Sequence, residues 1–188
     1  MTEILLFHHA QGLTAGVVSL AARFQVAGHV VHTPDLYDGQ TFSDLDEGVA
    51  HARSIGFDVL VERGVRLAED LPADLVYAGM SMGAMPAQTL AQTRPGARGL
   101  LVLHSAVSPA DLGGEWPAGL PMQIHTMVDD DWGDADVARQ LDEELPDAEV
   151  FLYEGDRHLF TDDSLDAYDA EAAAQVEQRA LAFLERIA

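Results

Sequence analysis

The chain has 188 residues, no cysteine and a formal net charge of -22, and all ten of its basic residues are arginines. The absence of cysteine excludes disulfides, thiolate metal sites and a cysteine nucleophile. A surplus of negative charge repels nucleic acid and anionic lipid, so we expect neither as a partner.

Short apolar segments alternate with segments of helical periodicity along the whole chain. The predicted strands are residues 3–7, 29–33, 75–78, 99–104, 121–128 and 148–153. The predicted helices are residues 13–27, 43–71, 84–92, 135–144 and 165–187. The remaining segments carry turn chemistry, and the longest of them, residues 105–119, is rich in proline and glycine.

Caps and breakers set several of these boundaries. Gly28 follows the first helix in the C′ position, where glycine is favoured. Ser43 or Asp44 can cap the long helix that follows, although three glycines within that helix weaken its continuity. Asp134 precedes residues 135–144 and is predicted to be the N-cap of that helix.

Near-continuous apolar strands with intervening helices predict a parallel sheet that is covered on both faces. We therefore expect a three-layer α/β fold with about six strands, in one domain over residues 1–188. No apolar run is long enough to span a bilayer, and the N-terminal residues show no signal-peptide pattern. These features predict a soluble cytoplasmic protein.

Residues 79–83, Gly-Met-Ser-Met-Gly, lie between a predicted strand and a predicted helix. G-x-S-x-G in this context is typical of a nucleophile elbow, in which the serine occupies the apex of a strained turn. The flanking glycines let the strand and the helix approach closely. Ser81 is therefore the candidate nucleophile. The motif by itself also fits a turn of small residues without catalytic function.

A serine hydroxyl needs a base to take its proton, and the base needs an acid to orient it. In this fold the chain order is serine, acid, histidine. Asp129, Asp130 and Asp131 follow the fifth predicted strand, and His158 follows the sixth. Three groups in this order, each just past a strand, predict a Ser-His-Asp hydrolase.

An oxyanion hole needs two N–H donors near the developing charge. We predict that Met82 supplies one donor, and that Ala10, or failing it Gln11, supplies the other from the loop after the first strand. His8 and His9 could suggest a metal site, but adjacent residues at a strand end point to opposite sides, so we expect no metal. No cofactor is needed. His9 and Gln11 are predicted to line the substrate pocket. Trp116, in the loop of residues 105–119, either lines the pocket as well or packs on the core, and the sequence favours neither.

Several segments resemble the dienelactone hydrolase family of α/β-hydrolases. They are residues 34–37 (PDLY), residues 121–125 (PMQIH) leading to Asp130, residues 153–160 (YEGDRHLF) and the final helix. The resemblance runs from residue 3 to the C-terminus. It implies that Ser81 is the nucleophile, Asp130 the acid and His158 the base.

The sequence departs from this family in three respects. The family's usual nucleophile is cysteine, and this chain has Ser81. Family members have additional N-terminal strands, which predicts a minimal six-stranded sheet here. The arginine that holds a lactone carboxylate in the family lies four residues past the histidine, where this chain has Asp162. An acid there predicts that the pocket disfavours anionic substrates.

The sequence thus predicts a serine hydrolase that cleaves a small, uncharged ester or lactone through an acyl-enzyme. A general carboxylesterase or a thioesterase would use the same chemistry. A protein that uses the same fold to bind a ligand without catalysis is an alternative from a different class. We expect a monomer rather than an obligate oligomer.

Overall fold

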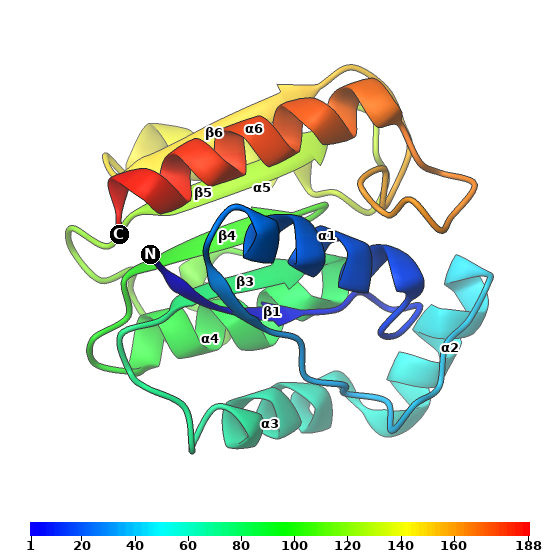
Figure 1. The fold of residues 1–188 in the computed structure, drawn as a ribbon, viewed down its shortest axis with the longest axis horizontal. Coiled ribbons are helices and arrows are strands. Elements are labelled where there is room, and N and C mark those ends of the chain that lie inside the picture. Colours follow the sequence, from blue (N-terminus) through cyan, green and yellow to red (C-terminus); the bar gives the residue numbers. More distant parts are fainter.

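The computed structural model describes residues 1–188 and is built on a six-stranded parallel sheet in the order β2-β1-β3-β4-β5-β6 (Figure 1). The strands are β1 (Glu3–Phe7), β2 (Val30–His32), β3 (Val76–Met80), β4 (Gly99–Leu103), β5 (Met122–Met127) and β6 (Ala148–Tyr153). The helices are α1 (Ala15–Val26), α2 (Leu45–Ile55), α3 (Phe57–Leu67), α4 (Ala84–Thr93), α5 (Ala135–Glu144) and α6 (Ala170–Arg186). None of these helices is long and apolar enough to cross a membrane.

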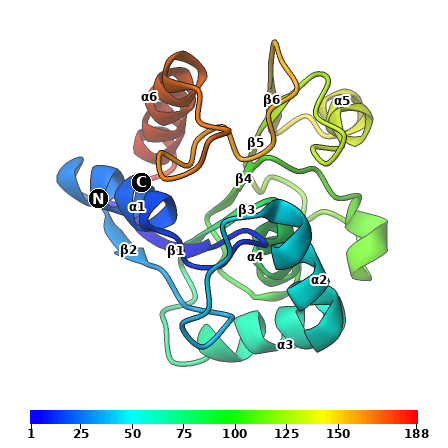
Figure 2. The same cartoon turned by 90° about the vertical axis from the view of Figure 1, so that its right-hand side faces the viewer.

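Alternate residues of each strand face different helical layers, as the period of two in a strand requires. In β1, Ile4 and Leu6 join a core cluster with residues of α1 and α6. Leu5 and Phe7 join a second cluster with residues of α2, α3, α4 and α5. Figure 2 shows α1 and α6 on one side of the sheet and the other helices on the opposite side. The predicted three-layer α/β fold is confirmed.

The largest differences from the predicted elements concern two helices and one cap. The long helix over residues 43–71 is two helices, α2 and α3, which are separated at Gly56 with a φ of 99°. The last helix begins at residue 170 instead of 165, because the Asp169 carboxylate accepts hydrogen bonds from the first N–H groups of α6. Asp134 occupies the N-cap position of α5, but its φ is 53° and its side chain makes no capping hydrogen bond, so that prediction was wrong in its mechanism.

The strand order reverses direction around β1, which pairs with β2 on one side and with β3 on the other. In a parallel sheet, loops that leave such neighbouring strands in opposite directions open a crevice at their carboxyl ends. The loop of residues 8–12, called the oxyanion loop below, follows β1, and Ser81 follows β3. The fold therefore places the elbow and this loop side by side.

Candidate active site

The elbow at Ser81 is a left-handed turn between β3 and a short 3-10 helix, residues 81–83, that runs into α4. The φ of Ser81 is 50°, a conformation that costs energy for a residue with a Cβ atom. The glycines of the motif are sterically required. A Cβ on Gly79 would lie 2.2 Å from the carbonyl oxygen of Gly83, and one on Gly83 would lie 2.5 Å from the carbonyl oxygen of Phe7.

A continuous chain of hydrogen bonds joins Ser81, His158 and Asp130. The Ser81 Oγ lies 2.8 Å from Nε2 of His158, and Nδ1 of the same ring lies 2.8 Å from Oδ2 of Asp130. The side chain of Asp130 is almost fully buried and that of His158 is nearly so. With Asp130 on Nδ1, the Nε2 atom is left to accept the Ser81 proton, which is the arrangement of a nucleophile, a base and an orienting acid.

The loop after β5 presents only the middle one of its three consecutive acids to the histidine. Asp129 and Asp131 are exposed, whereas the other oxygen of Asp130, Oδ1, accepts the backbone N–H of Trp132 at 2.9 Å. Gly133 closes the turn, and a Cβ there would lie 2.8 Å from Oδ2 of Asp130. The turn thus holds the Asp130 carboxylate through Oδ1, while Oδ2 is left to bond the imidazole.

Of the two candidates for the second oxyanion donor, only one has a free N–H group. The Gln11 N–H donates to Nδ1 of His9 at 3.2 Å. The Ala10 N–H donates to no other group of the chain, and Ala10 lies in the turn that directly follows β1. Met82 is the second residue of the 3-10 helix, where N–H groups lack partners within the helix. Ala10 and Met82 therefore follow the paired strands β1 and β3 with N–H groups that are available as donors.

Asp162 does not face a substrate pocket, so the prediction based on the position of the family arginine was wrong. Its side chain is fully buried, and its Oδ2 lies 2.8 Å from Nε2 of His9. Burial by itself would raise the pKa of Asp162, but hydrogen bonds from His9, Ser164 and Thr14 outweigh it and lower the pKa to about 2. This anion is enclosed by its partners, so it does not face a substrate.

The other three predicted pocket residues are also engaged within the protein. His9 is fully buried against Asp162. The Gln11 side chain donates to the carbonyl of Phe42 at 3.0 Å. Trp116 packs against the core and donates its Nε1–H to the carbonyl of Leu120 at 2.9 Å. A cavity of about 530 Å³ beside the oxyanion loop is lined by residues 13–15, 41–43 and 164–166, and none of the four predicted pocket residues lines it.

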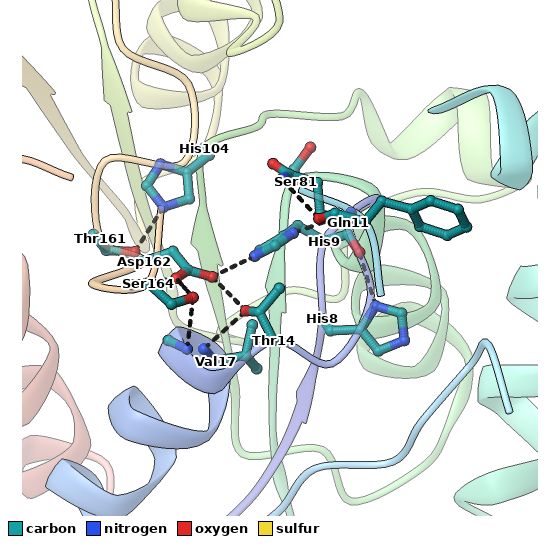
Figure 3. Close-up of polar contacts among 12 residues, drawn as sticks. His8, His9, Gln11, Thr14, Val17, Ser81, His104, Thr161, Asp162 and Ser164 are labelled. Atoms are coloured by element: carbon teal, nitrogen blue, oxygen red, sulfur yellow. Dashed lines mark hydrogen bonds and ion pairs between the residues drawn. The ribbon is translucent and has the colours of Figure 1, made fainter. Parts of the chain in front are cut away.

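Two residues near His158 were not singled out by the sequence. The Trp132 ring lies 6.4 Å from the His158 ring, centroid to centroid, and Trp132 is 43% exposed. His104 is fully buried, and its ring lies 6.0 Å from that of His158. Its Nε2 lies 2.7 Å from Oγ1 of Thr161 (Figure 3). The only sequence signal for Trp132 is that it directly follows the three acids Asp129, Asp130 and Asp131.

The sheet order, the elbow and the layers define an α/β-hydrolase fold. The model of the dienelactone hydrolase family matches residues 1–188, so the chain belongs to that family and is a hydrolase of this class. A search of curated proteins finds no match.

Solved structures share the fold at low sequence identity. A provisionally assigned dienelactone hydrolase from Klebsiella pneumoniae is 17% identical with a TM-score of 0.79, over 99% of this chain and 87% of its own. A dienelactone hydrolase-like promiscuous phosphotriesterase from metagenomic libraries is 18% identical with a TM-score of 0.75, over 100% and 87%. A provisionally assigned α/β-superfamily hydrolase from Xanthomonas campestris is 18% identical with a TM-score of 0.72, over 99% of both chains.

Proposed function

We propose that this protein is a serine hydrolase that cleaves a small, uncharged ester or lactone through an acyl-enzyme on Ser81. The observation that carries the proposal is the hydrogen-bonded chain from Ser81 through His158 to Asp130, at 2.8 Å for each bond. A protein that only binds a ligand has no need of all three groups in this alignment. The left-handed backbone at Ser81 supports the same conclusion, because strain of this kind collects at functional sites.

The reaction proceeds in two balanced steps. Ser81 Oγ attacks the carbonyl carbon while its proton moves to Nε2 of His158, and the N–H groups of Ala10 and Met82 bind the oxyanion. The bond between the carbonyl carbon and the leaving oxygen breaks, and the leaving oxygen takes the proton from His158. Water then gives a proton to His158 and attacks the acyl carbon. The bond from that carbon to Ser81 Oγ breaks, His158 returns the proton to Oγ, and the acid is released.

The charge of the chain supports an uncharged substrate. A net charge of -22 lowers the local concentration of anions around the protein. Arg157, the cation next to His158 in sequence, donates from Nη1 to the carbonyl of Tyr168 at 2.9 Å and so is engaged away from Ser81. Asp162 does not face the substrate, because its side chain is fully buried.

A fluorophosphonate probe tests the proposal directly. We expect covalent labelling of the folded protein at Ser81, mapped by mass spectrometry, and none in the Ser81→Ala variant. A screen of short-chain nitrophenyl esters, thioesters and lactones would then separate the candidate substrates. A folded wild-type protein that the probe does not label would contradict the proposal and favour a ligand-binding protein.

Trp132 is expected to contact the apolar part of the substrate. Its side chain is exposed beside His158. The bond from Trp132 to the Asp130 carboxylate is made by its backbone N–H, which any residue at this position retains. Trp132→Ala should therefore raise KM for aromatic esters about threefold to tenfold with little change in kcat, since an aromatic contact contributes on the order of 1 kcal/mol. KM for acetate esters should change much less.

The chain offers a matched control for this measurement, because it has only two tryptophans. Trp116 packs against the core, so Trp116→Ala should lower the melting temperature. At temperatures where the variant is folded, its KM for aromatic esters should be unchanged. If KM for aromatic esters rises with Trp116→Ala and not with Trp132→Ala, the substrate lies against the loop of residues 105–119 instead.

A further inference from the structure

The direction of the Ala10 N–H is set by the carbonyl of His9, because both belong to one planar trans peptide group and point in opposite directions. That carbonyl oxygen has two partners. Nδ1 of His8 lies 2.8 Å from it, and the N–H of Gly12 donates to it at 3.0 Å. The aim of the oxyanion donor therefore depends on the proton that His8 carries on Nδ1.

The tautomer of His8 follows from its other nitrogen. Nε2 of His8 accepts the backbone N–H of Leu36 at 2.9 Å, so this atom carries no proton. The proton is then on Nδ1, from which it is donated to the carbonyl of His9. The ring is fully buried, and burial lowers the pKa of His8 to about 4, so the imidazole is neutral at physiological pH.

His9 holds the opposite tautomer. Its Nδ1 accepts the Gln11 N–H at 3.2 Å, so its proton is on Nε2 and is donated to Asp162 at 2.8 Å (Figure 3). Burial lowers the pKa of His9 more than Asp162 raises it, so this ring is also neutral. By engaging the Gln11 N–H, His9 leaves Ala10 as the free donor of the turn.

Asp162 is held as an anion next to this neutral ring. Its carboxylate also accepts the Thr14 hydroxyl at 2.5 Å and both the N–H and the hydroxyl of Ser164, at 2.9 and 2.6 Å. The first turn of α1 lies against it so closely that a Cβ on Gly16 would be 1.7 Å from Oδ1. A helix N-terminus stabilises negative charge, which explains how a carboxylate without a cationic partner is tolerated there.

We propose that His8 and His9 are positioning residues, which in opposite tautomers aim the Ala10 N–H at the oxyanion, and that Asp162 selects the tautomer of His9. The proposal rests on the acyl-enzyme chemistry proposed above. Asp162 lies on the loop that also carries His158, so the same contact fixes the position of the base relative to the oxyanion loop.

Two variants of nearly equal shape test the role of His8. Asparagine places an amide N–H where Nδ1 of His8 lies, and leucine places a methyl group there, while both leave the Leu36 N–H without its partner. His8→Leu should lower kcat on the order of tenfold to a hundredfold with KM within about twofold, since loss of one oxyanion donor lowers kcat by about 10²–10³. His8→Asn should stay within about threefold of the wild-type kcat. Equal kcat values for the two variants would overturn the proposal.

The role of Asp162 has its own matched pair. An amide has one acceptor oxygen, so Asp162→Asn cannot accept from His9 and from Ser164 at once, and we expect kcat to fall about tenfold or more. Ser164→Ala removes one hydrogen bond to Oδ1 and leaves Oδ2, which faces His9, unchanged, so kcat should stay within about twofold. An equal fall in both variants would show a merely structural role.

Nitrogen-15 NMR of the wild-type protein reads the two tautomers without any variant having to fold. The expected result is a proton on Nδ1 of His8 and on Nε2 of His9, and any other assignment overturns the proposal. These outcomes are separable from a failure of the proposed function, which would show as a wild-type protein that fluorophosphonate does not label and that hydrolyses no ester. That result would remove the catalytic role whichever tautomers were found.

Discussion

Ser81→Ala is expected to lower kcat/KM for any ester that the protein hydrolyses by on the order of 10³-fold or more, with the fold intact. The substitution removes the only atom that can form the acyl-enzyme, whereas the oxyanion donors and the binding surface remain. Alanine retains a Cβ atom, so the strain of the left-handed turn, with its φ of 50°, is unchanged. The melting temperature should therefore stay close to that of the wild type.

Ser81→Gly is the matched control for the backbone. It should be as inactive as the alanine variant but more stable by about 1 kcal/mol, because glycine adopts positive φ without the cost that other residues incur. Kinetics with nitrophenyl acetate and thermal unfolding of the two variants provide the measurement. Ester hydrolysis at the wild-type rate in either variant would eliminate Ser81 as the nucleophile.

The second large effect concerns acid. Four histidines are fully buried, and three of them, His8, His104 and His125, make no hydrogen bond to a carboxylate. Burial lowers the pKa of His8 to about 4, that of His104 well below its usual range and that of His125 to about 3. In the unfolded chain each of these groups titrates near pH 6.5. Between pH 6.5 and 4 the unfolded state therefore binds protons that the folded state does not.

The stability contributed by these neutral rings is fully present above pH 6.5 and is lost as the pH falls toward 4. Three protons correspond to a slope of about 4 kcal/mol per pH unit, from 1.36 kcal/mol for each. From pH 6.5 to 5, above the range in which ordinary carboxyl groups titrate, the loss is then about 5 kcal/mol, because the unfolded rings are only half protonated at pH 6.5. The free energy of unfolding of a whole domain is on the order of 5–15 kcal/mol. We expect urea unfolding midpoints to fall steeply over this interval.

His125→Gln provides the control for this pH dependence. The ring of His125 is bonded to Tyr153 and Gln123 at 2.8 and 2.9 Å, on β5 and away from the candidate active site. Glutamine cannot titrate, so the variant should be less stable at pH 7 but should lose stability less steeply, by about 1.4 kcal/mol per pH unit. An unfolding free energy that stays constant between pH 6.5 and 5 would contradict the prediction.

The sequence was sufficient for the fold because each strand signal is local. Residues 135–144 and 148–153 were predicted to the residue, since the helix has a clear period and the strand contains the apolar run of residues 150–153. The long helix was misjudged because Gly56 is a weak signal by itself, and its positive φ depends on how α2 and α3 pack on the sheet. The start of α6 was misjudged because the helical periodicity by itself does not show that the Asp169 carboxylate caps the helix at residue 170.

The grouping of Ser81, Asp130 and His158 was readable from the sequence because each residue lies in the segment that follows a strand, and parallel strands bring their carboxyl ends to one edge. The environment of Asp162 was not readable. Its partner His9 lies 153 positions away in sequence, and only the folded loops show that the carboxylate is enclosed instead of facing a substrate. The same reason applies to the other predicted pocket residues, His9, Gln11 and Trp116. The direction in which a loop side chain points depends on packing, and the spacing of residues in the sequence does not show it.

Gly83 lets the elbow rest directly on the end of β1, where a Cβ would lie 2.5 Å from the carbonyl oxygen of Phe7 and 2.6 Å from that of His8. The helix start that carries Met82 and the loop that carries Ala10 are thus in backbone contact and have little room for independent motion. Donors that already point at the place where charge will develop need little reorganisation during the reaction, and this is the main source of electrostatic catalysis. A side chain at position 83 would therefore slow the chemical step by raising the reorganisation energy, even if every contact with the substrate were kept.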